Sequence, residues 1–261
     1  MGYVLGVDAS WSNSNASGVA LLKCNNKKIE LIRAGRSYEE FIASKINWDS
    51  KAKGSTPNFH QLLNTCPQVD VIALDIPLAP CVIEGRREAD QAISRRYGKC
   101  KASTHSPTKD HPGKLAKLIF DELRESGYEW ATTSFFVPAF IEVYPHVSII
   151  EVFNYPERLQ YKVREKARYW PKDSPEERNV RIISKLNELR CMLEAKIDKI
   201  DCILPKLDSA GKYTNAYLKG YEDLLDALVC ALTGYFYLIR KSEAFGDSRG
   251  AIWVPKVDHI A

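Results

Sequence analysis

Short apolar runs, each closed by a turn signal, recur along the chain and predict the strands of a sheet. Such runs, rich in Val, Ile and Leu and followed by Gly, Pro, Ser or Asn, are typical of buried strands. The pattern predicts six strands, at residues 3–9, 18–23, 29–33, 69–76, 140–144 and 251–254. Asn25-Asn26, between the second and third strands, is typical of a hairpin turn.

Apolar residues three or four positions apart predict five helices. Ser174 and Pro175 mark the start of the longest, because Ser is a favoured N-cap and Pro is favoured at the first helical position. Two polar segments with Gly and Pro, residues 47–61 and 99–113, are predicted to be loops. The helices are predicted at residues 38–46, 86–97, 114–126, 175–200 and 221–240.

The order of these elements indicates an α/β fold, in which helices pack on a mixed sheet. No internal repeat or clear linker divides the sequence, so we expect residues 1–261 to form a single domain. With 45% hydrophobic and 27% charged residues, the composition excludes a disordered tail. The uncharged stretch at 227–239 is shorter than the roughly 20 apolar residues of a membrane span, so we expect no membrane association.

Seven cysteines are scattered along the chain without a CxxC pair. This arrangement predicts neither a zinc site nor a disulfide framework. Free thiols fit a reducing compartment, and no basic-then-apolar signal peptide precedes the first strand. We therefore expect a cytoplasmic protein.

The net charge of +4 is unevenly distributed along the chain. Residues 86–117 hold nine basic and three acidic residues, a balance of +6, and residues 158–185 hold nine basic and four acidic residues, a balance of +5. These balances leave −7 for the remainder of the chain. The two basic segments are either solvated helix faces or a surface that contacts a phosphate backbone beside an acidic site.

Three predicted strands each carry one acid at or near the carboxyl end, directly before a turn. These acids are Asp8, Asp75 and Glu142. A carboxylate inside an apolar strand is costly to bury unless it is paired or binds a metal. Because sites in open α/β sheets form at the carboxyl ends of strands, we expect the three acids to converge there.

Asp223 and Asp226 lie three residues apart on the last predicted helix and therefore share one face of it. Small side chains continue that face, so we expect the helix to lie close against the sheet and to present both acids to it. Alternatively, Asp223 complements the positive end of the helix dipole, which explains Asp226 less well. The small residues are Ala227, Cys230, Thr233 and Gly234.

Clustered carboxylates with few histidines favour a hard divalent cation, Mg²⁺ or Mn²⁺. Two such ions activate a water and stabilise the leaving oxygen when a phosphodiester is hydrolysed. Asp226 is preferred over Asp223 as a ligand, and Glu142 either joins the site or pairs with an arginine. The predicted metal ligands are Asp8, Asp75, Glu142, Asp223 and Asp226, of which all except Asp223 are also predicted to be catalytic.

Basic residues are predicted to bind the substrate beside these acids. Arg87 and Arg95 are predicted to clamp phosphate, because guanidinium groups bind phosphate oxygens in pairs; an Arg87–Asp90 salt bridge is the alternative. Lys162 is predicted to stabilise transition-state charge or is a solvated lysine. His146 is predicted to contact the substrate as a proton donor or to be a ligand.

Two further features are expected near the site. Trp11 follows the first strand and is either a packed aromatic residue or a platform on which a base stacks. The loop at 99–113 contains His105 and His111, and we expect it to lie over the site.

The acid pattern resembles that of the RNase H-like nuclease superfamily, with a strand acid before a hairpin, a second strand acid and a late Asp-x-x-Asp helix. The Asp223/Asp226 spacing is similar to that of the last helix of the RuvC Holliday-junction resolvases. Over nearly its full length the chain resembles an uncharacterised family of predicted RNase H-fold nucleases, domain of unknown function 429. The motifs that carry this resemblance are Gly6-Val7-Asp8, Asp75-Ile76-Pro77-Leu78, Arg87-Glu88-Ala89-Asp90 with Arg95, Glu142-Val143-Tyr144-Pro145, Tyr161-Lys162, residues 223–227, Gly246-Asp247 and residues 250–255.

The resemblance implies a five-stranded mixed sheet with helices on both faces and a divalent-metal site. Apart from Tyr161-Lys162, residues 156–219 depart from it and form a possible basic helical insertion that sets substrate choice. The function expected from the acids, the basic segments and the resemblance is a metal-dependent nuclease whose partner is DNA or RNA.

Two alternatives stay open. An actin-like ATPase or sugar-kinase relative shares the first strand acid and hairpin, but that class needs Gly-rich phosphate loops, and Ala9-Ser10-Trp11 follows Asp8 here. The other alternative is a non-catalytic nucleic-acid-binding module that keeps an RNase H-like fold.

Overall fold

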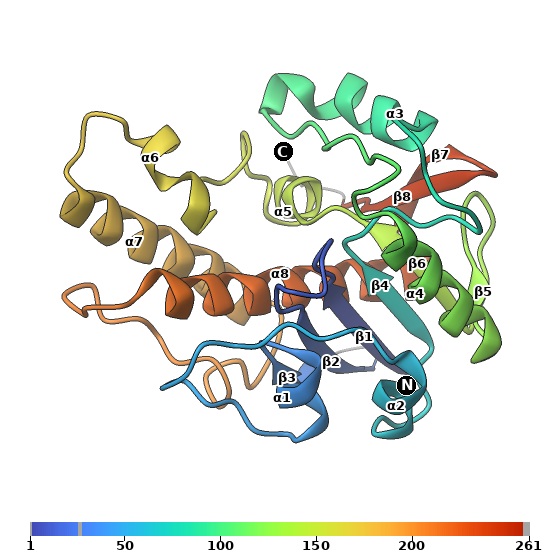
Figure 1. Ribbon diagram of the computed structural model, residues 1–261, viewed down its shortest axis with the longest axis horizontal. Coiled ribbons are helices and arrows are strands. Elements are labelled where there is room, and N and C mark those ends of the chain that lie inside the picture. The colour runs from blue at the N-terminus through green and yellow to red at the C-terminus, as the bar shows by residue number, and fades with distance from the viewer. Residues whose placement is uncertain (1, 26–27, 258–261) are drawn as a thin grey trace.

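The computed structural model describes residues 2–25 and 28–257, which form a mixed α/β fold (Figure 1). Asn26, the second residue of the predicted hairpin turn, lies outside these residues. Beside it, the N–H of Asn25 donates to the carbonyl oxygen of Lys28 (2.9 Å).

One sheet contains the eight strands of the described residues, in the order β3-β2-β1-β4-β6-β8-β7, with β5 beside β6. Strands β1, β4, β6 and β8 run parallel to their neighbours in that group, whereas β2, β3 and β7 join by antiparallel pairing. The strands are β1 (Gly2–Asp8), β2 (Gly18–Cys24), β3 (Ile29–Gly35), β4 (Val71–Leu74), β5 (Glu129–Trp130), β6 (Ala139–Val143), β7 (Ser242–Asp247) and β8 (Gly250–Pro255).

The six strands expected from the apolar pattern are all present, and β5 and β7 are additional. The five-stranded sheet implied by the resemblance is therefore corrected to eight strands. Strand β5 has only two residues, and β7 lacks a continuous apolar run because it lies at an edge of the sheet. Pairing with β8 along its whole length holds β7 in place, from Ser242 opposite Pro255 to Asp247 opposite Gly250.

Eight α-helices occur in the described residues. Helix α7 begins at the predicted N-cap: the Ser174 hydroxyl accepts from the N–H of Glu177, and the Glu177 carboxylate accepts from the N–H of Ser174. The helices are α1 (Tyr38–Ile42), α2 (Phe59–Asn64), α3 (Glu88–Tyr97), α4 (Lys114–Glu125), α5 (Pro145–Phe153), α6 (Lys166–Tyr169), α7 (Pro175–Glu194) and α8 (Asn215–Leu238).

Helices α2, α5 and α6 were not predicted. The Asn58 side chain caps α2 by accepting from the N–H of Gln61 (2.8 Å), so this helix begins inside the segment predicted to be a loop. Helix α5 is buried on nearly every side and therefore has no 3.6-residue polar period. Pro145, which was interpreted as the end of a strand, is also the first residue of α5, a position that favours proline.

Three predicted helix boundaries change by four residues or more. Helix α1 ends at Ile42 rather than at position 46. Helix α8 begins six residues before position 221, because the Thr214 hydroxyl caps it by accepting from the N–H of Tyr217 (3.1 Å). Helix α7 ends at Glu194 rather than at position 200.

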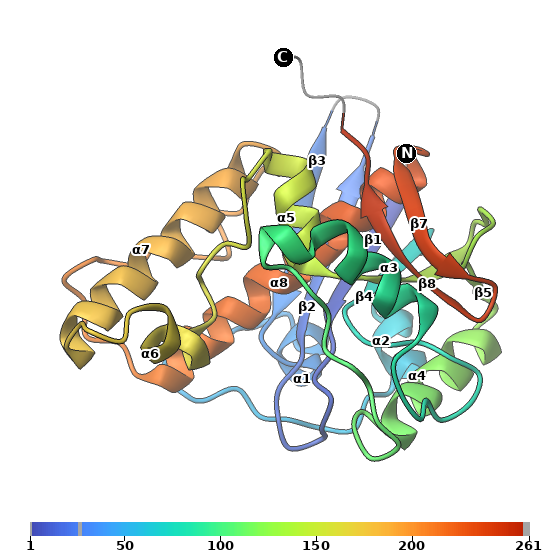
Figure 2. The same ribbon diagram turned by 90° about the horizontal axis from the view of Figure 1, so that it is seen from above.

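Helices cover both faces of the sheet, as the resemblance implied. Helix α8 lies across one face against β1, β2 and β4, and α7 packs on α8 (Figures 1 and 2). Helices α1, α2 and α4 contribute side chains to the core on the opposite face, and α3 packs against β7 and β8. The expected insertion, residues 156–219, contains α6 and α7, which both views place at one end of the molecule, away from β7 and β8.

Candidate metal centre

Strand β1 turns Asp8 toward helix α8. Alternate residues of a strand face opposite sides, and Val4 packs in the core on the α8 side, so Gly6 and Asp8 face that side too. A Cβ atom at Gly6 would lie 2.2 Å from the carbonyl oxygen of Ala227, and one at Gly18 would lie 2.1 Å from that of Asp223. The absence of side chains at these two positions allows the α8 backbone to contact β1 and β2, as the small-residue face predicted.

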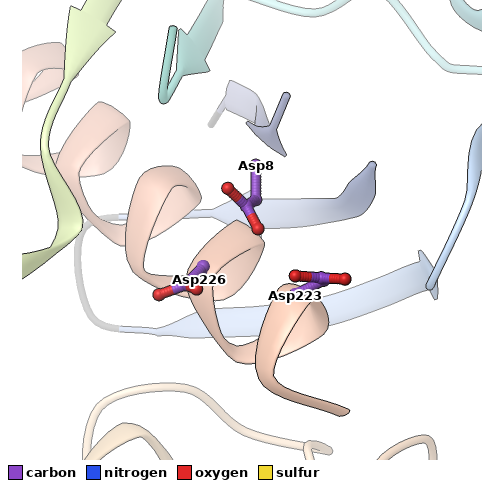
Figure 3. Close-up of side chains that lie close together, drawn as sticks. All are labelled: Asp8, Asp223 and Asp226. Atoms are coloured by element: carbon purple, nitrogen blue, oxygen red, sulfur yellow. The ribbon is translucent and has the colours of Figure 1, made fainter. Parts of the chain in front are cut away.

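This contact brings Asp8, Asp223 and Asp226 together (Figure 3). One carboxylate oxygen of each lies within 4.8 Å of one from each of the others. Asp226 is fully buried, and Asp223 is buried in the next turn of α8 toward its N-terminus. Burial, followed by the charges of Asp226 and Asp223, raises the pKa of Asp8 well above its ordinary value. The three acids therefore repel one another when no cation lies among them.

Two lysines supply positive charge to this triad. The Nζ of Lys162 lies 2.5 Å from Oδ2 of Asp226, and the Tyr161 hydroxyl donates to the other oxygen of the same carboxylate. Lys219 pairs with Asp223 and lies 2.8 Å from an oxygen of Glu222. The carboxylates of α8 are thus ion-paired.

Sequence reasoning missed Lys219 and the role of Glu222. Glu222 is 1% exposed and accepts a hydrogen bond from the N–H of Val163 (2.6 Å), which attaches the segment after Tyr161 to α8. The signal for Lys219 was its spacing, since it stands three and four residues before Glu222 and Asp223 on one helix.

Asp75 lies beside the triad but outside the 4.8 Å cluster. Its N–H donates to the carbonyl oxygen of Val7 (2.9 Å), which places it next to the end of β1. Burial raises its pKa to about 7; the charge of Lys162 lowers this pKa, and that of Asp226 raises it.

Glu142 is engaged by an arginine, the alternative that the sequence left open. Its two carboxylate oxygens accept from Arg87 at 2.6 and 2.7 Å, and one also accepts from the N–H of Leu78 (2.9 Å). Strand alternation explains this position. Ile141 and Val143 pack in the core on the α8 side, so Glu142 faces the other side of the sheet.

The basic residues predicted to bind substrate separate into two groups. Arg87 also pairs with Asp90 (3.0 Å), as the alternative interpretation held, and it lines the cavity next to Glu142. His146 is buried and lines the same cavity. Arg95 has a side chain that is 62% exposed and pairs with Glu88 on the outer surface of α3, so the structure does not bring it to the acids.

Two adjoining cavities, of about 290 and 710 Å³, open over the acids. The smaller lies at the N-terminus of α5, and the larger reaches Asp8 and Asp223. The basic segment after α5 supplies a wall to both through Arg164, so the predicted insertion borders the acidic site. The residues common to both cavities are Trp11, Asp75, His105, Arg164 and Lys219.

The family described as "Protein of unknown function (DUF429)" matches residues 6–247, from β1 through β7 and including the complete acid triad. The chain belongs to the DUF429 family. No curated protein and no solved structure matches the chain. The match establishes the family, and the activity has to be inferred from the site.

The acid triad of this DUF429 protein fits a hard divalent cation. All three donors are carboxylate oxygens, which Mg²⁺ and Mn²⁺ prefer. Burial raises the pKa of Asp8 and of Asp223, and lysines pair with Asp223 and Asp226, so positive charge is favourable at this position. Within the described residues, no helix combines the length and apolar character needed to cross a membrane.

Proposed function

We propose that this protein is a metal-dependent nuclease that hydrolyses phosphodiester bonds of DNA or RNA. The observation that carries the proposal is the convergence of Asp8, Asp223 and Asp226, of which Asp8 and Asp223 line a cleft whose walls hold lysine and arginine and Asp226 lies buried beneath them. Carboxylates beneath cationic walls suit a phosphate group held by a divalent cation.

Asp8, Asp223 and Asp226 would hold Mg²⁺ or Mn²⁺, which when bound activates water and stabilises charge on a phosphate. Lys162 and Lys219 lie against the same carboxylates and are positioned to share the charge of an approaching phosphate. With a pKa of about 7, Asp75 is suited to accept a proton near neutral pH. Arg87 holds Glu142 away from the triad.

We also propose that the fold is RNase H-like. Five adjoining strands, β3-β2-β1-β4-β6, give the five-stranded mixed sheet of that superfamily, with the acid of β1 before a hairpin. The late helix with its Asp-x-x-Asp pair packs directly on β1. On this proposal, β5, β7 and β8 are additions to the five-stranded sheet of the superfamily.

One observation favours the non-catalytic binding module as a second candidate. Lys162 and Lys219 already neutralise Asp226 and Asp223, so the acids of α8 have cationic partners without a metal. A module of this kind would bind nucleic acid through its basic walls and would not require Mg²⁺.

Cleavage assays test the proposal. Labelled single-stranded, duplex and branched DNA and RNA would be incubated with the protein in Mg²⁺, Mn²⁺ or EDTA. The variants are Asp8→Asn and, as a matched control, Asp121→Asn, whose carboxylate pairs with Lys117 on the surface of α4.

We expect metal-dependent cleavage by the wild type and by Asp121→Asn, and a loss of at least about a hundredfold in Asp8→Asn, comparable to removing a group that stabilises transition-state charge. Absence of cleavage from every substrate, together with nucleic-acid binding in EDTA, would reject the nuclease and support the binding module.

A further inference from the structure

The smaller cavity has features that the acid triad does not explain. We call it the α5 cavity, because Tyr144, Pro145 and His146 at the start of α5 line it. Its volume of about 290 Å³ lies near the lower end of the range of small-molecule sites, about 300–1,000 Å³. A group the size of one nucleotide fits this volume, whereas a duplex does not.

His146 is a buried polar side chain without a hydrogen-bond partner. It is 4% exposed, lines the cavity, and makes no hydrogen bond through its ring to any residue that the structure describes. Its ring instead lies edge-on to those of Tyr144 and Tyr161, with centroids 5.4 Å away in each case. Buried polar groups are normally paired, so this ring points to a partner that enters from the cavity.

Two arginines on the segment that follows α5 add unused donors. The Nε of Arg158 is buried with no partner among the described residues, although its Nη2 contacts Glu165 at 3.3 Å. Arg164 is exposed, lines both cavities, and has no hydrogen bond or ion pair within residues 2–25 and 28–257. Guanidinium groups with free donors match the paired oxygens of a phosphate.

The positive field converges on His146. After burial, the charges of Lys162 and Arg158 lower the pKa of this histidine, and both of these side chains line the same cavity as its ring. The N-terminus of the nine-residue helix α5 adds the positive end of its dipole at the same wall, although Pro145 has no N–H and the N–H groups of Val147 and Ser148 donate to the carbonyl oxygen of Tyr144. An anion in the cavity would therefore meet a helix N-terminus, a neutral imidazole and cationic side chains together. Five carboxylates also line the cavity, and those of Asp90, Glu142, Glu165 and Glu222 are paired with arginine or lysine.

We propose that the α5 cavity binds a phosphomonoester group, carried either by a free nucleotide or by the phosphorylated end of a nucleic-acid strand. Apolar side chains of Ile76, Pro77 and Ile252 also line the cavity and suit the uncharged part of such a ligand. Asp75 borders this cavity and the larger one, so a strand end in the α5 cavity continues toward the acid triad. Cleavage of that strand rests on the proposed nuclease function; binding of the phosphomonoester does not.

Calorimetry in EDTA tests the binding step without metal or cleavage. The probes are AMP, inorganic phosphate and adenosine. The variants are Arg164→Gln, which changes an exposed side chain, and His146→Phe, which keeps the ring shape. Arg95→Gln is the control, because Arg95 carries the same charge on the outer surface of α3.

We expect AMP and inorganic phosphate to bind the wild type and to compete with each other, while adenosine does not bind. Arg164→Gln should weaken AMP at least about tenfold, the effect of losing one charge-assisted hydrogen bond, and His146→Phe should also weaken it. Arg95→Gln should bind AMP as the wild type does. Failure of AMP and phosphate to bind the wild type, or equal AMP affinity in wild type and Arg164→Gln, would overturn the proposal.

Oligonucleotides distinguish the two sources of the phosphate. Single strands of one sequence with a 5′-phosphate, a 3′-phosphate or neither would be titrated in EDTA. Tighter binding of one phosphorylated strand, lost in Arg164→Gln, assigns the cavity to strand ends. Equal binding of all three, with AMP still bound, assigns it to free nucleotides.

The two proposals fail separately. AMP binding lost in Arg164→Gln supports the phosphomonoester site even if no strand is cleaved with Mg²⁺ or Mn²⁺. Conversely, cleavage that Asp8→Asn abolishes supports the nuclease even if AMP does not bind, and the α5 cavity proposal is then rejected.

Discussion

Single charged side chains set the state of the acid triad. Lys162 contacts Asp226, which is fully buried, and Lys219 contacts Asp223, so the carboxylates of α8 depend on lysines for compensation. The divalent cation that we propose at the triad would perform the same electrostatic role and would therefore compete with the lysines for the same oxygens.

Removing Lys162 should reveal this competition. In EDTA, Lys162→Met should lose about 3 kcal/mol of unfolding free energy, because it leaves the buried Asp226 carboxylate without its lysine. Mn²⁺ should then stabilise the variant more than it stabilises the wild type. Urea unfolding with and without Mn²⁺ measures both effects. Lys117→Met, in the exposed pair with Asp121, should change stability by at most about 0.5 kcal/mol, and an equal Mn²⁺ effect in wild type and Lys162→Met would contradict competition.

Asp75 should make stability depend on pH. Its pKa is about 7 in the folded protein and near 3.8 when unfolded, so the native state holds this proton more tightly between those values. The stabilising contribution of Asp75 to the free energy of unfolding is fully present below about pH 4 and is lost as the pH rises through about 7. In EDTA, the wild type should therefore lose stability relative to Asp75→Asn between pH 5 and pH 8. A constant difference in melting temperature between the two proteins over that range would be inconsistent with the raised pKa.

At the scale of single residues, strand alternation in the sequence could have predicted which of the three strand acids face α8. Val7 and Leu74 pack in the core on the face opposite α8, so Asp8 and Asp75, which follow them, face α8. Glu142 instead lies between Ile141 and Val143, which face α8 themselves. Counting alternate positions would have separated Glu142 from the other two. The lysine partners were harder to predict, because Lys162 reaches Asp226 across 64 residues of sequence.

At the scale of elements, helix α8 positions the site by direct backbone contact with the sheet. The small-residue face predicted this approach, and Gly6 and Gly18 complete it from the strand side. The first six residues of α8 were missed because their start depends on the Thr214 cap rather than on an apolar period. Helix α5 was missed because it is buried on nearly every side.

A methyl group at Gly6 should displace α8 and weaken the triad. The added Cβ would lie 2.2 Å from the carbonyl oxygen of Ala227, so Gly6→Ala should lose at least about 2 kcal/mol of unfolding free energy and bind Mn²⁺ more weakly. The control is Gly85→Ala, because nothing lies within 4 Å of a Cβ there. Chemical denaturation and Mn²⁺ titration by calorimetry measure the two effects. Wild-type Mn²⁺ affinity in Gly6→Ala would show that close approach of α8 is not required.

For the whole molecule, the two basic segments noticed in the sequence border one cleft. The loop with His105 and His111 and the segment with Arg164 line it together with Lys51, which lies in a stretch predicted to be a loop. Sequence charge indicated a basic surface, but only the folded chain shows which cations face the acids. Arg95 shows the limit of the charge pattern, because it lies in the same basic segment as Arg87 but faces away from the acids.

Salt dependence should identify the cations that contact nucleic acid. Lys51→Gln should weaken binding in EDTA and reduce the slope of log K against log salt concentration by about 0.7–0.9, the value for one phosphate contact. Lys53→Gln is the matched control, because Lys53 is exposed two residues away and is not among the described residues that line the larger cavity. Fluorescence anisotropy with a labelled strand measures the slopes. Identical slopes in both variants would place the binding surface elsewhere.

The triad joins the two ends of the chain, since Asp8 ends the first strand and Asp226 lies in the last helix. A ribosome that adds about 5–20 residues each second makes Asp226 on the order of ten seconds or more after Asp8. The nascent protein therefore lacks two of its three clustered acids while most of its sheet is being synthesised. On the proposed nuclease function, an enzyme assembled in this order stays inactive beside its own messenger RNA until translation is nearly complete.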